Sequence, residues 1–490
     1  MPQADPRLGC LMTDHSTNLA MGIALTTAAT ATALATPPVR WLAFRLGAVD
    51  HEGPRRFHRG TTPRMGGVPL AFGVIVGVVC AWLWSAPWYV SDPRCWGLAG
   101  GAILILLLGI LDDMRSVRPR YKLLVQAGAA TCAYMVGLRI EILALPAGGS
   151  MDLGWFGLPI TLLWIVGVTN AMNLLDGLDG LAAGVTILIA AALLLVGTGR
   201  GGTPAYVAVG AGATIGACFV MGIQTLRRRK MFLGDSGSLC LGFILANLAL
   251  LACKHEGVAI SPALPFIMLG LPIADTLASV VRRILLGRSP FSADRGHIHH
   301  ALLSLGMTPR RVVMVLWGLA AIYGLIGLAV AAQPVWVGLL AVPAIAIFPG
   351  LVYWRLGYFS VRAWSDRRRL ERILKRIIRR IRLQNTPGEL HESARRACRL
   401  LNLDYVCIRR GTPLAPELER RKPLVELGRP GCTGEPKASP HPMGKGMTIT
   451  AHHHTGAGPL VPDAHEAVTS PVLRALAGRV AAIRIEQVNR

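Results

Sequence analysis

Long runs of hydrophobic residues alternate with short polar segments through the first 354 residues of the chain. A helix that crosses the hydrocarbon core of a bilayer needs about 20 such residues. Eleven runs approach that length, and each is predicted to form a membrane-spanning helix. They lie near 17–36, 66–88, 96–111, 123–138, 157–172, 181–199, 204–224, 238–253, 264–281, 312–331 and 337–354. The predicted fold class is an all-α polytopic membrane protein with about 11 transmembrane helices and a small cytosolic C-terminal α/β region.

The composition agrees with this pattern. Of the 490 residues, 52% are hydrophobic, and the mean hydropathy of +0.47 is high for a soluble protein of this length. Lys and Arg outnumber Asp and Glu by 51 to 27, and the net charge of +24 favours contact with anionic lipids, an anionic substrate or nucleic acid. The ten cysteines form no CxxC pair, so the sequence suggests neither a zinc site nor a disulfide framework.

Basic residues are concentrated in alternate loops between the predicted spans. The loops at 38–65, 112–122, 170–180, 225–237 and 282–311 hold 20 of the 51 Lys and Arg residues, whereas the N-terminal segment and the intervening loops hold 5. The positive-inside rule therefore places the first set in the cytoplasm, the N-terminus outside and the C-terminus inside. Because Arg7 is accompanied by Asp5 and Asp14, we interpret the first run as a retained span rather than a signal peptide.

The unusual polar residues lie in this cytoplasmic set of loops, at the ends of predicted spans. A transporter would more often place such groups near the middle of the bilayer. The first cluster is the adjacent pair Asp112 and Asp113 in GILDDMRSVRPRYK. Neighbouring carboxylates are costly unless they share a cation or a proton, so the pair suits a metal–phosphate site or a base. A solvated helix cap is the alternative.

The second cluster is NAMNLLDGLDG, in which Asn170, Asn173, Asp176 and Asp179 recur every three residues. On a helix this spacing makes a slowly drifting polar stripe. Two amides and two acids suit hydrogen bonds to a nucleotide and coordination of Mg2+ through oxygen. Capping explains one Asp, but it does not explain four polar residues in register.

Two further clusters carry groups that suit phosphate. In GDSGS, Asp235 follows a glycine just before a predicted span, an arrangement that suits a diphosphate–Mg2+ site, although such turns are also common caps. In the HIHH loop, His297, His299 and His300 follow Arg295. Imidazole and guanidinium groups donate to phosphate oxygens. A zinc site there lacks thiolates and a third well-spaced ligand, and a plain surface loop is the other alternative.

The first predicted cytoplasmic loop, DHEGPRRFHRGTTPRMGG, contains His58 and Arg64 beside the bilayer. Basic groups in that position could hold the phosphate of a lipid. Ordinary positive-inside bias is the alternative explanation.

Together the five clusters resemble the polyprenyl-phosphate N-acetylhexosamine-1-phosphate transferases, the superfamily of WecA, TagO and MraY, also called glycosyltransferase family 4. The matching pieces occur in family order across about residues 38–310: DD with a following KLLVQ, NAMNLLDGLDG, GDSGS, and HIHH after PFSAD. Members similar to MraY carry three adjacent histidines in the last motif. HIHH therefore favours the WecA/TagO-like branch and a plain UDP-N-acetylhexosamine, with GlcNAc as the default sugar, over a muramyl-peptide donor.

The resemblance implies a reaction at the cytoplasmic face of a bacterial inner membrane. An oxygen of polyprenyl (undecaprenyl) phosphate attacks the β-phosphorus of UDP-N-acetylhexosamine, UMP leaves, and lipid-linked cell-envelope glycan synthesis begins. The implied cofactor is Mg2+, and Mn2+ stays open. Because the lipid phosphate is already largely ionised at neutral pH, we expect direct displacement rather than a covalent enzyme intermediate.

The resemblance also implies roles for individual residues. Asp112 and Asp113 match the acidic pair that is assigned to activating the lipid phosphate. Asp235 and Asp176 match the metal-binding positions. Lys122 matches a basic residue that follows the acidic pair, and we expect it to bind the lipid phosphate with Arg64 and His58. The residues expected to bind the nucleotide and the sugar are Asn170, Asn173, Asp179, His297, His299, His300 and Arg295.

The remaining residues, 355–490, extend beyond the minimal family pattern. Residues 355–385 contain apolar positions at helical spacing among many Arg and Lys residues, which predicts a basic amphipathic helix on the anionic inner leaflet. Residues 386–490 are predicted to form a small cytosolic domain. Its opening, a helix followed by a strand around Tyr405 to Arg409, is similar to the start of GAF-like domains, whereas the Gly/Pro-rich stretch 411–462 is interpreted as loop and 468–488 as a last helix.

Two other classes of protein compete with the enzyme. A polytopic transporter of an anionic solute predicts polar residues halfway through the spans, and few are found. A membrane scaffold that works through its tail leaves the acidic and amide clusters without a purpose. Nucleic acid binding fits the charge but lacks any motif, so the expected partners are the two substrates and membrane lipids. The sequence leaves the oligomeric state open, a homodimer included.

Overall fold

The computed structural model describes residues 14–50, 62–85, 93–145, 149–198, 205–226, 231–253, 263–285, 297–331, 333, 335–355, 379, 403–410, 425–428, 441–443 and 447–453. The chain divides into two compact units, 1–358 and 359–490. The first unit carries the acidic, amide and histidine clusters.

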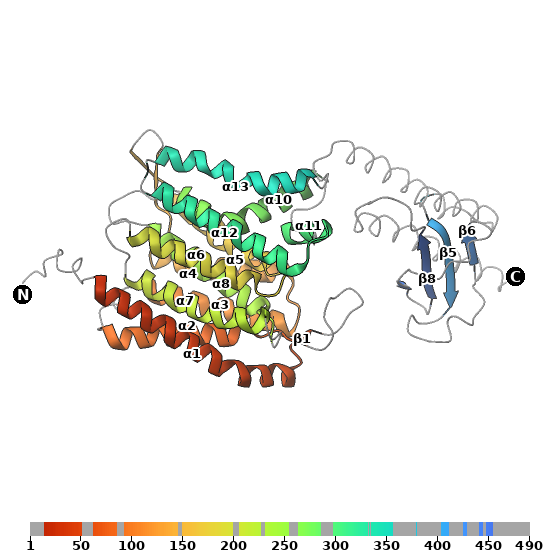
Figure 1. Cartoon of the computed structure of the whole chain (residues 1–490), viewed down its shortest axis with the longest axis horizontal. Helices are drawn as coiled ribbons and strands as arrows, with labels where there is room; N and C mark the ends of the chain where they lie inside the picture. Colours follow the sequence, from red (N-terminus) through yellow and green to blue (C-terminus); the bar gives the residue numbers. More distant parts are fainter. Residues whose placement is uncertain are drawn as a thin grey trace, which may run out of the picture. The chain divides into compact units, whose positions relative to one another are not determined.

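The first unit is a bundle of helices that lie side by side (Figure 1). Each of the eleven predicted apolar runs coincides with a helix or, in one case, with two consecutive helices. A further short helix, α11, begins within the HIHH motif, directly after His297, and is not predicted by the apolar pattern. The helices are α1 (Asp14–Leu46), α2 (Gly67–Ser85), α3 (Pro93–Met114), α4 (Pro119–Met135), α5 (Gly157–Leu175), α6 (Leu181–Thr198), α7 (Ala205–Leu226), α8 (Gly234–Cys253), α9 (Ala263–Met268), α10 (Gly270–Leu285), α11 (Ile298–Ser304), α12 (Pro309–Ala331) and α13 (Val335–Arg355).

Seven helices among the described residues are long and apolar enough to cross a membrane: α1, α2, α3, α5, α7, α8 and α12. Helix α6 is apolar but shorter. The chain is therefore a multi-pass membrane protein, built mostly of helices. The predicted total of eleven spans stays a prediction, because α4, α9 and α10 have 17, 6 and 16 residues and are shorter than these seven helices.

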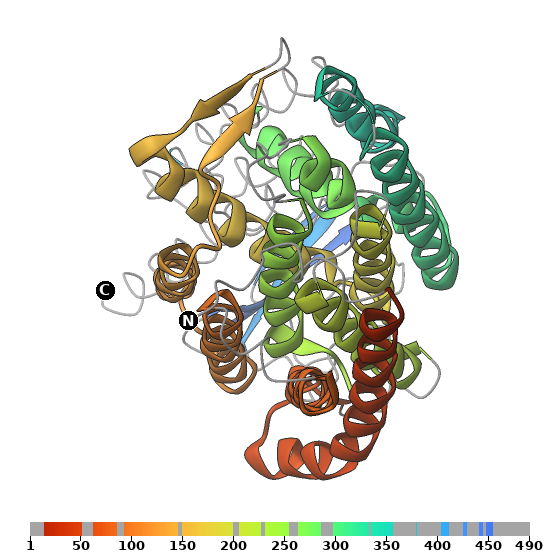
Figure 2. The ribbon, with the colours of Figure 1, turned by 90° about the vertical axis from the view of Figure 1, so that its left-hand side faces the viewer.

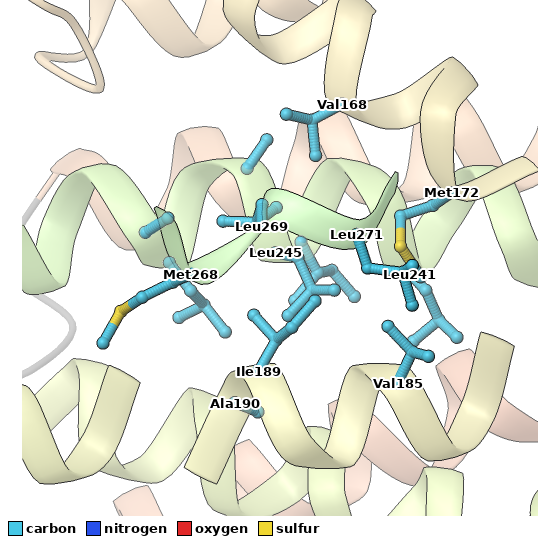
Figure 3. Packing of buried hydrophobic residues seen from close by; sticks show 14 of the residues in the cluster. Val168, Met172, Val185, Ile189, Ala190, Leu241, Leu245, Met268, Leu269 and Leu271 are labelled. Atoms are coloured by element: carbon cyan, nitrogen blue, oxygen red, sulfur yellow. The ribbon is translucent and has the colours of Figure 1, made fainter. Parts of the chain in front are cut away.

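Helix α8 forms the centre of the bundle, since 94% of its apolar window is buried. It packs against α3, α5 and α6, and the side chains that fill the space are mostly branched aliphatics and methionines (Figure 3). Leu241 and Leu245 of α8 lie between Met172 of α5 and Ile189 of α6. Packing α8 on three sides fixes the position of its first turn, where Asp235 lies.

Helix α1 packs against α2 and α7 through very small residues. Ala20, Ala24 and Ala28 are fully buried, and a side chain at Gly73 of α2 would overlap Thr32 of α1. Small residues let membrane helices approach closely, so that van der Waals contact and helix packing hold them together.

The predicted span at 264–281 is broken into α9 and α10 at Leu269. Pro272 lies in the first turn of α10, where it has no backbone N–H to give to a preceding helical carbonyl. The break therefore falls where proline is tolerated. Asp275 and the buried Arg282 and Arg283 lie on this second helix.

Two small sheets connect the helices. Strands β1 (Val49–Asp50) and β2 (Thr62–Pro63) are antiparallel, and the segment after β2 continues as a ladder to the turn before α8. In that ladder the N–H of Phe232 donates to Pro63 O at 2.8 Å, and the N–H of Gly66 donates to Phe232 O at 3.0 Å. Strands β3 (Ile142–Ala144) and β4 (Ser150–Asp152) form an antiparallel hairpin in the predicted external loop 139–156 (Figure 2).

The second unit contains a four-stranded antiparallel sheet in the order β6-β5-β8-β7. Strand β5 (Leu403–Arg410) covers the predicted strand. Strands β6 (Val425–Gly428), β7 (His441–Met443) and β8 (Met447–His453) lie inside 411–462, so the interpretation of that stretch as loop is wrong. The alternating residues of MTITA pair with β5, which outweighs the many nearby Gly and Pro residues. The predicted helices at 355–385 and 468–488 lie outside the described residues, apart from Arg379 and the end of α13.

Candidate active site

The acidic pair at the end of α3 meets the first turn of α8. The carboxylate of Asp113 accepts hydrogen bonds from two backbone N–H groups, that of Asp235 at 2.8 Å and that of Ser236 at 3.1 Å. A carboxylate at a helix N-terminus satisfies donors that have no partner within the helix and interacts favourably with the helix dipole. Gly234 has φ +72°, and a side chain there would overlap both Arg64 O and the Asp113 carboxylate, so only glycine fits this turn.

Lys122 of α4 joins the other two acids. Its ammonium group lies 2.5 Å from Asp112 Oδ2 and 2.7 Å from Asp235 Oδ2. Asp112 also accepts a 2.7 Å hydrogen bond from the backbone N–H of Val117, which closes the turn between α3 and α4. The side chains of Asp112 and Lys122 are only 11% and 20% exposed, so the positive charge stabilises two carboxylates that are largely shielded from water.

The end of α5 adds an amide to this group. Asn173 donates a 3.1 Å hydrogen bond to Asp235 Oδ1 and a 2.9 Å hydrogen bond to Ser238 Oγ. Asp235 is therefore held from both sides, by Lys122 on one oxygen and by Asn173 on the other. Carboxylates from α3 and α8, the ammonium of α4 and the amide of α5 form a cluster that we call the acid site.

Asn170 has a different environment. Its amide exchanges hydrogen bonds with the buried Gln126 of α4, of which the shorter is 2.6 Å, and donates to Val166 O at 2.7 Å. Among the described residues, these hydrogen bonds lead to Gln126 and Val166 and not to the acids. Asn170 therefore holds α5 against α4, and its expected role in nucleotide binding stays a prediction.

The polar stripe expected along α5 is interrupted. Helix α5 ends at Leu175, with Asp176 as its C-cap, and Gly180 has φ +76°. Asp176 and Asp179 thus lie on a turn beyond the helix, so the stripe covers only Asn170 and Asn173. Burial, reinforced by the charges of Asp235, Asp113 and Asp179, raises the pKa of Asp176 well above its ordinary value. Asn173, which donates to Asp235, is only three residues before Asp176, so the turn begins beside the acid site.

The HIHH motif meets the same turn. His299 is buried, and its ring lies so close to Gly177 that a side chain at Gly177 would overlap it. Burial and the neighbouring His300 lower the pKa of His299 to about 3, so the imidazole is neutral. His300 is exposed, with its ring centroid 4.2 Å from that of His299. Motifs more than 100 residues apart in the chain thus come together at one end of the bundle.

His297 is held by residues of α10. Its Nδ1 lies 2.9 Å from Asp275 Oδ2 and 3.3 Å from Ser279 Oγ, and Asp275 Oδ1 accepts a 2.7 Å hydrogen bond from the N–H of Ile298. Its Nε2 and both ring nitrogens of His299 are buried without a hydrogen-bond partner. Buried polar atoms in this state are uncommon in folded proteins, and they indicate where a ligand would bind.

The remaining predicted site residues fall into two groups. Arg64 lies on the segment after β2, and its backbone oxygen lies against Gly234 in the first turn of α8. His58 and Arg295 lie outside the described residues. The expectation that they bind phosphate stays a prediction.

The acid site suits a divalent cation in part. Its oxygen donors are the type that Mg2+ prefers. A cation would also reduce the repulsion between Asp176 and the neighbouring carboxylates of Asp235 and Asp113. Among the described residues no three His, Cys, Asp or Glu side chains form a ready chelating group. Mg2+ needs no such cage, because it keeps several waters and binds through one or two carboxylates together with substrate phosphates. Asp176 and Asp235 therefore fit the role of its protein ligands.

Sequence reasoning missed several residues of this region: Asp275, Ser279, Gln126 and Ser238. Asp275 carried a usable signal, since a lone acid in an apolar run marks a functional position by default. Gln126 and Ser238 carried none, because their partners, Asn170 and Asn173, are 44 and 65 residues away in the chain.

Comparison with known proteins gives a consistent result. The family model described as glycosyl transferase family 4 matches residues 95–253. A Bacillus subtilis protein named "Probable undecaprenyl-phosphate N-acetylglucosaminyl 1-phosphate transferase" is 35% identical over 321 residues, which cover 65% of this chain and 87% of the relative. The "Decaprenyl-phosphate N-acetylglucosaminephosphotransferase" of Mycobacterium tuberculosis is 35% identical over 59% of this chain and 78% of its own length. The "Undecaprenyl-phosphate alpha-N-acetylglucosaminyl 1-phosphate transferase" of Escherichia coli K12 is 30% identical over 70% and 90%.

Proposed function

The chain belongs to glycosyl transferase family 4, and we propose that it transfers N-acetylglucosamine 1-phosphate from UDP-N-acetylglucosamine to a polyprenyl phosphate in the membrane. In this reaction an oxygen of the lipid phosphate forms a bond to the β-phosphorus of the donor. The bond between that phosphorus and the bridging oxygen breaks, and UMP leaves. The product is a lipid diphosphate sugar, which would start a lipid-linked cell-envelope glycan.

The observation that carries this proposal is the convergence on Asp235. Lys122 and Asn173 bind its carboxylate, and Asp113 binds the backbone around it, so three motifs of the family meet at one residue. The names of the relatives supply the sugar and the lipid acceptor. A transporter is less well supported, because these groups gather at the ends of helices rather than halfway along them.

Both reactants are anions, so bringing two phosphates together is the main electrostatic barrier to transfer. Bound Mg2+ would neutralise part of the diphosphate charge and polarise a phosphoryl oxygen. Lys122 lies beside Asp112 and supplies a second positive charge, which suits it to hold the incoming lipid phosphate. Asp176 and Asp235 are the proposed metal ligands, and Mn2+ is the alternative cation.

Direct displacement is the proposed course of the reaction. A covalent phospho-aspartate would have to form on a carboxylate oxygen of the acidic pair that already accepts a hydrogen bond. Both oxygens of Asp113 accept backbone hydrogen bonds, and those of Asp112 accept bonds from Val117 and Lys122. The lipid phosphate is itself ionised at neutral pH, so Asp112 serves to position Lys122 rather than to remove a proton.

The reaction would take place at the cytoplasmic face of a bacterial inner membrane. The charge bias of the loops supports this orientation, with 20 Lys and Arg residues in the loops that carry the site against 5 on the other side. His299 lies against Gly177, and the rings of His297 and His300 lie beside that of His299. These three histidines are proposed to contact the sugar diphosphate.

Membranes that contain the protein test the proposal with Mg2+, polyprenyl phosphate and a panel of UDP-sugars. UMP and a lipid-linked product are expected with UDP-N-acetylglucosamine. Asp235→Ala should abolish the product, whereas Asp152→Ala, in the hairpin of β3 and β4, should leave it unchanged. Wild-type turnover in the Asp235→Ala variant would refute the metal assignment, and no product from any UDP-sugar would refute the proposed reaction.

A further inference from the structure

A second pair of buried ionisable groups lies beside the acid site. Asp275 of α10 and His297, the residue before α11, have side chains that are 1% and 5% exposed. Asp275 Oδ2 lies 2.9 Å from His297 Nδ1, and Asp275 Oδ1 accepts the N–H of Ile298 at 2.7 Å. One carboxylate thus holds both the ring of His297 and the first backbone donor of α11.

This geometry determines which nitrogen of His297 carries a proton. An ionised carboxylate only accepts hydrogen bonds, so Nδ1 must be the donor. Nε2 of the ring is then the nitrogen that accepts a hydrogen bond.

Nε2 itself is buried and has no hydrogen-bond partner in the chain. The described groups that lie against the ring are Asp275, Ser279 and His299, whose ring is nearly parallel to that of His297, with the centroids 6.0 Å apart. His299 in turn touches Gly177, the neighbour of Asp176. The ring of His299 therefore lies between His297 and the turn beside the acid site.

We propose that Asp275 is a positioning residue that fixes the Nδ1–H tautomer and the orientation of His297, so that Nε2 accepts a hydrogen bond from a hydroxyl or amide N–H group of the UDP-sugar. This inference rests on the proposed function, because it assigns the open nitrogen to the donor substrate. The competing explanation is structural: Asp275 would only anchor the start of α11 through Ile298.

Asp275→Asn separates the two explanations. The asparagine oxygen can still accept from Ile298, but its NH2 group then faces His297 and forces Nδ1 to accept. The start of α11 stays anchored, while the tautomer is reversed, so that Nε2 becomes a donor and can no longer accept. Loss of this hydrogen bond to the donor substrate should raise the KM for UDP-N-acetylglucosamine about 10- to 100-fold. The KM for polyprenyl phosphate should not change.

Two variants complete the comparison. Asp275→Glu keeps the acceptor-only carboxylate and should recover part of the loss. Thr276→Val removes a buried hydroxyl from the next position of α10, where it has no partner, and should leave both KM values unchanged. If Asp275→Asn lowers only the maximal rate and leaves both KM values at the wild-type level, Asp275 is an anchor and the proposal is overturned.

A spectroscopic readout keeps this test independent of turnover. In protein labelled with 15N-histidine, the His297 signals, identified by their loss in His297→Gln, should show protonated Nδ1 in the wild type and unprotonated Nδ1 in Asp275→Asn. Addition of UDP-N-acetylglucosamine should shift Nε2 in the wild type. If wild-type protein makes no lipid product, the proposed function fails by itself. An identical tautomer in both proteins, or an Nε2 signal that UDP-N-acetylglucosamine does not shift, overturns the role of Asp275.

Discussion

Asp113 caps the helix that begins beside Asp235: its Oδ1 accepts a 2.8 Å hydrogen bond from the Asp235 backbone N–H, and its Oδ2 accepts one from Ser236. The two acids of DD thus have different environments. Asp112 faces Lys122, whereas Asp113 holds the turn on which Asp235 is presented. The two adjacent acids therefore have different roles. Asp112 pairs with the positive charge of Lys122, and Asp113 holds the turn in place.

Removal of this cap should destabilise the protein. Asp113→Ala leaves two backbone donors without their charged acceptor, and we expect a loss of about 2 kcal/mol in the free energy of unfolding. The apparent Tm of the detergent-solubilised protein measures it. Asp152→Ala, which removes a single exposed hydrogen bond to Gly154, is the control and should lower the Tm only slightly. Equal Tm shifts in the two variants would contradict the capping role.

Lys122 should be required for turnover. Lys122→Met leaves Asp112 and Asp235 close together without the charge between them and removes the proposed contact to the lipid phosphate. We expect UMP release to fall about 100-fold, as for the loss of one charge-stabilising donor at an active site. Arg120→Met changes an exposed cation on the same helix and should keep wild-type activity. Comparable activity in the two variants would exclude the bridging role.

Gly177 should tolerate no side chain. The methyl group in Gly177→Ala would overlap the ring of His299 and displace the HIHH motif from the turn that follows α5. A displacement of about 1 Å can cost on the order of 100-fold in rate, and a loss of that size is expected in the UMP assay. Gly128→Ala on α4 places a methyl group in open space and should leave the rate unchanged. Full activity of Gly177→Ala would show that the two motifs need not touch.

The buried neutral His299 should make stability depend on pH. Its pKa of about 3 in the folded protein lies below the ordinary 6.5, so between these values the unfolded chain binds a proton that the folded chain does not. Stability should therefore fall as the pH falls below about 6.5, by up to about 1.4 kcal/mol per pH unit from this group. The apparent Tm, measured from pH 7.5 to 5, should decline more steeply in the wild type than in His299→Gln. Thr276→Val removes no titrating group and should keep the wild-type slope; parallel slopes for all three proteins would contradict the burial of a neutral ring.

The sequence predicted the apolar helices well, because runs of about 20 hydrophobic residues leave few alternatives in a membrane. It also indicated that Asp112, Asp113, Asn173 and Asp235 belong to one site. It could not show that Asp113 is a cap, because that depends on the direction in which α8 begins. The prediction of one polar stripe from Asn170 to Asp179 was wrong beyond Leu175, because the helix ends there and a glycine-containing turn follows.

Two other differences between the prediction and the structure have physical causes that the hydrophobic pattern does not show. The break at Leu269 separates α9 from α10, although the apolar run continues across it, because Pro272 suits the start of a helix. Asp275 went unnoticed within that run, and its partner, His297, lies 22 residues further along the chain. In the second unit, pairing with β5 produced strands in a stretch whose Gly and Pro content favours loops.

A doubly labelled donor tests the central claim most directly. Purified protein in lipid vesicles would be given polyprenyl phosphate, Mg2+ and UDP-N-acetylglucosamine that carries 32P at the β-phosphorus and 3H in the sugar. The account predicts that both labels enter the lipid fraction in equal amounts as unlabelled UMP is released. Sugar label in the lipid without 32P, or both labels inside the vesicles with none in the lipid, would contradict it.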